Sequence, residues 1–162
     1  MTTTTAPKLL LGDVHVGAEL PPLTYEVTAT TVVLGALSAR DYRPMHHDYD
    51  FAVNRNGEKN IFLNTPNQAA WYERYVTDWT GPHGRLARLT FRMRHPVFPE
   101  DTMVMRGTVT AVSTDDAGCG FVELNITMKV GDADNSDCDV RVAIPVDEND
   151  NPWARSGDQW KP

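Results

Sequence analysis

Hydrophobic and polar residues alternate along the second half of the chain. Leu89, Phe91 and Met93 alternate with arginine and threonine, and a longer series of alternating apolar residues runs from Val122 to Val130. A repeat of two is the period of a strand with one buried face. The pattern therefore predicts four strands, at residues 85–96, 101–112, 120–130 and 137–146. The turn sequences STDDAG and GDADNS join the last three of them as a meander.

The first half of the chain contains one segment with a clear helical period, at residues 64–82. Trp71, Tyr75 and Trp79 recur at every fourth position, which places them on one face of a helix. Such a stripe is typical of core packing. The alternative is that the three aromatic rings line a tunnel for an acyl chain.

The ends of this helix carry recognisable signals. We expect Thr65 as the N-cap, Pro66 at the first helical position and Gln68 as the third residue of a capping box. Gly81, followed by proline, ends the helix.

One more strand is expected before the helix, at residues 23–30, followed by a short helix or turn at 30–42. The order of elements indicates the α+β class, with a curved antiparallel sheet wrapped around one long central helix. The length of 162 residues fits a single domain. We divide the chain into a disordered lead (1–8), the domain (9–146) and a polar C-terminal tail (147–162). The unpaired sheet edges of such a unit favour at least a dimer.

The composition narrows the possible partners. A formal charge of −7 argues against nucleic acid and anionic membranes as partners. The N-terminus has neither a basic region nor a long apolar run, so we expect a cytoplasmic protein. Cys119 and Cys138 lie in predicted strands or at their edges. A cross-strand disulfide is conceivable, although free thiols are favoured in a reducing compartment.

The most unusual segment is ARDYRPMHHDYDFA, residues 39–52. A metal site is one interpretation, but His46 and His47 are adjacent and no ligand motif is present, so no metal is expected. A polar turn is the second, with Asp48 as a helix cap. The third is a catalytic loop, in which Pro44 bends the chain so that Asp41 and His46 act as an acid–base pair on one water.

The sequence RDYRPMHHD resembles the D-x-N-P-x-H-x-D signature of MaoC-like, (R)-specific enoyl-CoA hydratases, which have a hot-dog fold. Arg43 stands where the signature has asparagine. The segment HPVFPEDTMVMRGTV resembles the family's P-v-x-x-G-D-t-l sequence, with Glu100 where glycine is usual. The resemblance covers roughly residues 10 to 146 and favours the catalytic interpretation.

The resemblance implies roles for individual residues. Asp41 would activate water and His46 would orient it for addition to a 2-enoyl-CoA, with coenzyme A as part of the substrate and no separate cofactor. Family members carry His-Gly-Met-like residues where this helix begins, and Pro66 has no N–H to offer the thioester oxygen. Three groups remain as candidates for that donor: the Asn64 side chain and the N–H groups of Thr65 and Asn67.

Coenzyme A also requires cations for its phosphates. Three arginines of one predicted strand are the candidates, unless they only form its solvated face: Arg88, Arg92 and Arg94.

A narrower resemblance links NIFLN and RYVTDWTGP to the small subunits of heteromeric bacterial steroid side-chain enoyl-CoA hydratases. It implies a role in steroid degradation and lipid metabolism, with either a homodimer or a heteromer containing a second MaoC-like subunit. Three alternatives remain: a catalytically silent subunit that completes a partner's pocket, an acyl-CoA thioesterase on the same fold, and a non-catalytic acyl-CoA or sterol-binding module.

Overall fold

A computed structural model describes residues 8–162 of the chain. The helices are α1 (Ala29–Ser38), α2 (Tyr49–Asn54) and α3 (Thr65–Thr80), and the strands are β1 (Leu23–Glu26), β2 (Arg85–Met93), β3 (Thr102–Thr114), β4 (Gly120–Val130) and β5 (Ala133–Ala143). The disordered lead expected at residues 1–8 lies outside this range except for Lys8. The Lys8 ammonium donates to the carbonyl oxygens of Glu148 and Asp150.

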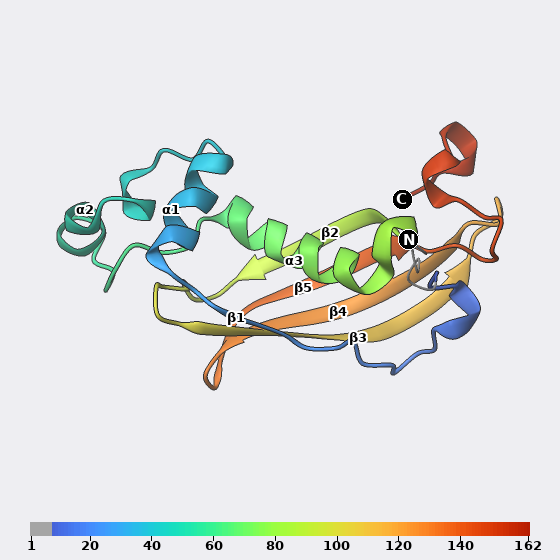
Figure 1. Cartoon of the computed structure of the whole chain (residues 1–162), viewed down its shortest axis with the longest axis horizontal. Coiled ribbons are helices and arrows are strands. Elements are labelled where there is room, and N and C mark those ends of the chain that lie inside the picture. The colour runs from blue at the N-terminus through green and yellow to red at the C-terminus, as the bar shows by residue number, and fades with distance from the viewer. Residues whose placement is uncertain (1–7) are drawn as a thin grey trace, which may run out of the picture.

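The five strands form one antiparallel sheet in the order β1-β3-β4-β5-β2. Helix α3 runs across one face of this curved sheet, while α1 and α2 gather at one end of the molecule (Figure 1). The predicted α+β class and the hot-dog arrangement are confirmed. Strands β1 and β2 form the two edges of the sheet.

The core lies between α3 and the concave face of the sheet. The inward residues of β4 are buried, among them Leu124, Ile126 and Met128. Tyr72 and Tyr75 of α3 are also buried within this core. Each large apolar side chain buried in this way contributes roughly 1.5–3 kcal/mol.

The aromatic stripe of α3 belongs to this core, as its spacing predicted. Trp71 and Tyr75 are buried and Trp79 packs against the same cluster. The Tyr25 and Trp71 rings lie 4.4 Å apart between centroids, so the stripe also fastens β1 to the helix.

Helix α3 begins one residue earlier than the sequence suggested. Its N-cap is Asn64, whose side-chain oxygen accepts a hydrogen bond from the N–H of Asn67 at 3.1 Å. Thr65 and Pro66 are therefore the first two helical residues, and the expected capping box with Gln68 is wrong. Asparagine and threonine are both good N-caps, so composition alone could not choose between them.

Within residues 8–162, two residues other than glycine have backbone angles in the left-handed region. Glu100 has a φ of 74°, in the turn before β3, at the position where the related signature carries glycine. Arg40 has a φ of 55° directly before Asp41. Glycine would adopt these angles without strain, so both residues mark turns that the rest of the fold enforces.

The C-terminal tail packs on the end of the molecule opposite α1 and α2 (Figure 1). The Arg85 guanidinium lies 3.7 Å from the centre of the Trp160 ring, and Arg155 pairs with Asp150. Arg155 also donates to the carbonyl oxygens of the β3–β4 turn, at Ala117 and Gly118. The tail is thus tied to the sheet by specific contacts.

Both cysteines are free and buried in different clusters, as the preference for thiols predicted. Within residues 8–162, no helix combines the length and apolar character that a membrane crossing requires.

Candidate active site

The polar stretch folds into a bent connection between α1 and α2. Helix α1 ends at Ser38, the N–H of Asp41 donates to the Ala36 carbonyl, and a single 3₁₀ turn runs over Pro44–His46. Arg43 is extended, as expected for a residue before proline. This bend brings Asp41 and His46 together: Nε2 of His46 lies 3.6 Å from Oδ2 of Asp41.

The backbone carbonyl of Phe62 fixes the His46 ring. Nδ1 of His46 lies 2.8 Å from this oxygen. A carbonyl oxygen only accepts, so Nδ1 carries a proton, and in the neutral form of the ring Nε2 presents a lone pair toward Asp41. The Phe62 ring also meets the imidazole edge-on, with 4.9 Å between centroids, and His46 is only 5% exposed.

Asp41 is held from two directions. Its Oδ2 accepts a hydrogen bond of 3.0 Å from the side-chain amide of Asn64, and its Oδ1 accepts one of 3.3 Å from the N–H of Arg43. The Asn64 bond is the largest cause that holds the Asp41 pKa below its ordinary value. The Arg43 N–H and the positive charge of Arg43 act in the same direction, as does the charge of His46 when its ring is protonated. Partial burial opposes them. The carboxylate is therefore kept ionised.

Asn64 links this carboxylate to the start of α3. Its amide nitrogen donates to Asp41 while its oxygen caps the helix, and the residue is 1% exposed. The Asn64 cap takes up the N–H of Asn67, and the Asn64 carbonyl takes up that of Gln68. Because Pro66 has no N–H, only the N–H of Thr65 is without an acceptor in this first turn, as far as the structure describes the chain (residues 8–162).

A close approach of α1 and α3 supports the same end of the helix. The Asn67 amide donates to the Thr31 carbonyl at 3.3 Å. A Cβ atom on Gly35 would lie 1.7 Å from Nδ2 of Asn67. Glycine at position 35 therefore makes room for the contact that positions α3 beside Asp41.

No family model matches the chain, but comparison with known proteins identifies relatives in sequence and structure. The chain is 41% identical to the beta subunit of 3-oxo-4,17-pregnadiene-20-carboxyl-CoA hydratase from Mycobacterium tuberculosis. The 98 aligned residues make up 60% of this chain and 75% of that protein. It superposes on a chain of the ChsH1–ChsH2 complex from the same organism with a TM-score of 0.73 and 32% identity, covering 80% of this chain and 98% of the other.

The chain belongs to the MaoC-like hydratase family. The (R)-hydratase PhaJ1 from Pseudomonas aeruginosa has the same fold, with a TM-score of 0.72 at 16% identity and coverage of 86% of this chain and 88% of that chain. The predicted family, including its similarity to steroid hydratase subunits, is confirmed.

Two other polar residues of the stretch have local roles. Asp48 caps α2 by accepting from the N–H of Phe51 at 3.1 Å, as the turn interpretation predicted for it. Nε2 of His47 lies 3.3 Å from the Tyr42 carbonyl, and the residue is exposed. Among residues 8–162, no group of three or more His, Cys, Asp or Glu side chains is arranged to hold a metal ion.

The three candidate arginines are not gathered at the dyad. Arg88 and Arg92 are exposed on β2 and alternate with the inward-facing Leu89 and Phe91, so they lie on the sheet face opposite α3. Arg94 follows the end of β2, where its Nε donates to Asp137 at 2.8 Å. Arg94 thus lies just beyond the strand that was expected to carry all three arginines, and it pairs with the residue that faces Arg92 across the sheet.

Sequence reasoning missed two features of this MaoC-like site. The Phe62 carbonyl that orients His46 gives no signal in the sequence because it is a backbone group. Gln68 was taken for a helix cap, yet it is 1% exposed and its side-chain oxygen has no hydrogen-bond partner within residues 8–162.

Proposed function

We propose that this chain hydrates the 2,3 double bond of a 2-enoyl-CoA, with Asp41 and His46 as its catalytic residues. The observation that carries the proposal is the pair of acceptors Oδ2 of Asp41 and Nε2 of His46, 3.6 Å apart. One water can donate a proton to each of them, which leaves an oxygen lone pair free to attack. Two acceptors of fixed orientation suit the activation of water rather than simple binding of a thioester.

In the proposed reaction, the water oxygen adds to the β-carbon of the enoyl thioester while Asp41 accepts one of its protons. The electron pair of the double bond moves onto the thioester as an enolate. The proton taken up by Asp41 is then delivered to the α-carbon, which leaves Asp41 ionised for the next turnover. His46 orients the water throughout.

The negative charge that develops on the thioester oxygen needs a donor. The free N–H of Thr65 at the N-terminus of α3 is our choice among the three candidates, because the N–H of Asn67 and the Asn64 side chain are already engaged. The dipole of the 16-residue helix α3 adds to this stabilisation.

We further propose a bulky acyl-CoA of the steroid side-chain type as substrate and a second MaoC-like subunit as partner. Support comes from the relatives: one is named as the beta subunit of a steroid acyl-CoA hydratase, and another was solved as a two-component complex. Arg43, which is exposed in the same bent connection as Asp41, is a further candidate cation for the coenzyme A phosphates.

The test is turnover of 2-enoyl-CoAs by the purified protein, followed by loss of the ultraviolet absorbance of the conjugated enoyl thioester. Short and steroid-like substrates are compared, with and without any subunit that co-purifies. Asp41→Asn and His46→Ala should each reduce the rate about 100-fold or more. His47→Ala, a neighbouring histidine with no contact to Asp41, is the matched control and should retain activity.

Two results would reject the proposal. Hydration that persists in Asp41→Asn would place the chemistry elsewhere. Release of free coenzyme A from saturated acyl-CoA, without hydration of enoyl-CoA, would identify a thioesterase instead.

A further inference from the structure

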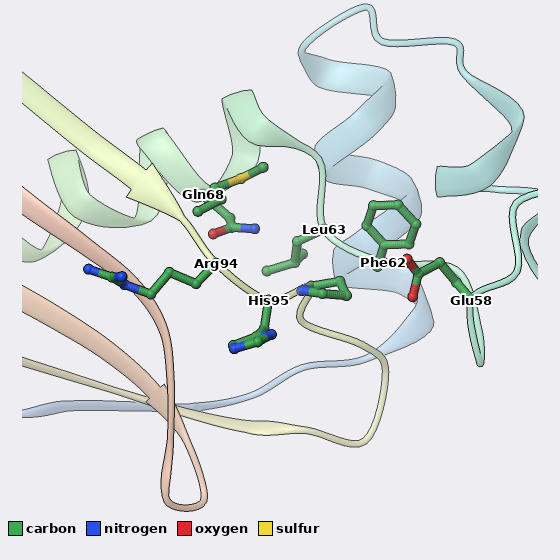
Figure 2. A pocket seen from close by; sticks show the side chains of 8 residues that line it. Glu58, Phe62, Leu63, Gln68, Arg94 and His95 are labelled. Carbon is green, nitrogen blue, oxygen red and sulfur yellow. The ribbon is translucent and has the colours of Figure 1, made fainter.

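A cavity of about 200 Å³ opens between the start of α3 and the end of β2. Figure 2 shows its lining, with Leu63 and Gln68 on one side and the Arg94–His95 segment on the other. Its walls are largely apolar, contributed by Phe62, Leu63, Met93 and Pro96. The cavity is smaller than the roughly 300–1,000 Å³ of a pocket that takes a whole small ligand, so it fits only one end of a larger molecule.

One wall of this cavity is shared with the catalytic pair. The Phe62 carbonyl binds His46, while the Phe62 side chain lines the cavity. Leu63 lines the cavity too, and Asn64, the next residue, binds Asp41. Gln68 follows Asn64 by four residues, one helical turn, so the cavity begins about 6 Å along α3 from the reaction site.

The feature of this cavity that calls for a ligand is the Gln68 carboxamide. It points from α3 into the space between Leu63 and Arg94 (Figure 2). The residue is 1% exposed, and its Oε1 has no partner among residues 8–162. A buried polar group without a partner is unfavourable, and most such groups in folded proteins have one.

From this we infer that the cavity binds the distal end of the substrate's acyl group and that Gln68 hydrogen-bonds an uncharged oxygen there, a hydroxyl or a ketone. The inference rests on the proposed function. A carboxamide suits either oxygen, because its C=O accepts from a hydroxyl and its NH₂ donates to a ketone. The apolar part of the lining favours a hydrocarbon body. Of the charged groups that also line the cavity, Arg94 is already paired with Asp137, and Glu58 disfavours an anionic end, so an uncharged oxygen suits the cavity best.

A purely hydrocarbon acyl group would leave the Gln68 amide without a partner in the complex as well. Sites built to hydrogen-bond a substrate oxygen discriminate against analogues that lack it, for this reason. Gln68 is thus a specificity-determining residue. It takes no part in the chemistry at Asp41 and His46.

The test compares three 2-enoyl-CoAs of one carbon skeleton, with a distal hydroxyl, a distal ketone or neither. For the wild-type protein, kcat/KM should be about 10-fold or more higher for at least one oxygenated substrate. Gln68→Met, which has similar length and no hydrogen-bonding group, should lose this preference and favour the hydrocarbon substrate. The ratio between hydroxyl and ketone shows which of the two oxygens the amide binds.

The same preference in wild-type protein and Gln68→Met would overturn the inference while leaving hydration intact. Absence of turnover with all three substrates would reject the proposed function instead. In that case calorimetric binding of the same three thioesters to both proteins decides the role of Gln68. Equal affinity ratios in the two proteins would overturn it, and a ratio lost in Gln68→Met would support it.

Discussion

Two carboxamides lie one turn apart at the start of α3 and differ completely in how their hydrogen bonds are satisfied. Asn64 donates to Asp41 and accepts from Asn67. Gln68 is equally buried, yet its oxygen has no partner within residues 8–162. A saturated amide holds other groups in place, whereas an unsaturated amide at a cavity is free to bind a ligand. The difference assigns Asn64 to positioning and Gln68 to recognition.

Asn64→Asp is the substitution with the largest expected effect, because it replaces the amide that donates to Asp41 with a carboxylate. The helix cap survives because aspartate is also a good N-cap. A second carboxylate now faces Asp41 and raises its pKa. We expect kcat/KM at neutral pH to fall about 100-fold, measured as hydration of an enoyl-CoA. Unchanged activity would mean that Asn64 has no influence on Asp41.

Asn64→Ser is a milder change that keeps a cap but removes the donor to Asp41. Since this hydrogen bond is the largest cause of the lowered Asp41 pKa, the pKa should rise. The acid limb of the kcat/KM profile should then move to higher pH, with a loss of about 10-fold at its maximum. A lower maximum with no shift of the limb would indicate a purely structural role.

The same change affects stability with a definite sign. A lowered native pKa gives Asp41 a stabilising contribution that is present above the unfolded-state pKa and lost as the pH falls through the native pKa. The free energy of unfolding of Asn64→Ser should therefore decrease less on acidification than that of the wild type. Denaturant titrations at several pH values measure this difference.

The contact between α1 and α3, in which the Asn67 amide packs against Gly35 and donates to the Thr31 carbonyl, can be tested with a double-mutant cycle. Gly35→Ala places a Cβ atom against the Asn67 amide and should displace it from the Thr31 carbonyl, with a loss of about 1 kcal/mol. An Asn67→Ala background removes the two overlapping atoms and leaves only Cβ of residue 67, 3.1 Å away, so the same change should stabilise α1 by at most about 1 kcal/mol because alanine favours helix over glycine. If the two substitutions changed the free energy of unfolding additively, residues 35 and 67 would not be coupled, which would contradict the proposed contact between α1 and α3.

Gln68→Met tests, by its effect on stability, whether the Gln68 amide is unpaired in the folded protein. Replacing an unpaired buried amide with an apolar side chain of similar length should raise the free energy of unfolding of the unliganded protein by about 1 kcal/mol. Denaturant unfolding without substrate measures it. A marked loss of stability would mean that the amide has a structural partner.

The sheet could be predicted from local alternation, and the pairing of Asp41 with His46 from the family resemblance. Alternation identified β4 at its observed bounds, whereas β5 begins at Ala133, four residues earlier than expected, because GDADNS was taken for a turn. A proline between Asp41 and His46 suggested a bend that brings them together. The start of α3 was misplaced by one residue, since two adjacent residues had equal claims as caps.

The partners of the pair could not be predicted, because they come from distant positions. Asn64 reaches Asp41 across 23 residues and Phe62 reaches His46 across 16. The burial of Gln68 was equally hidden, because a glutamine in the first turn of a helix is usually a surface residue.

The most direct test of the catalytic role of Asp41 and His46 is to run the reaction in heavy-oxygen water and analyse the product by mass spectrometry. We expect an intact 3-hydroxyacyl-CoA with heavy oxygen on the β-carbon, formed by the wild-type protein and reduced at least 100-fold in Asp41→Asn. Heavy oxygen in a free carboxylic acid, with coenzyme A released, would contradict hydration. Equal labelling of the β-carbon by Asp41→Asn would contradict the role of Asp41.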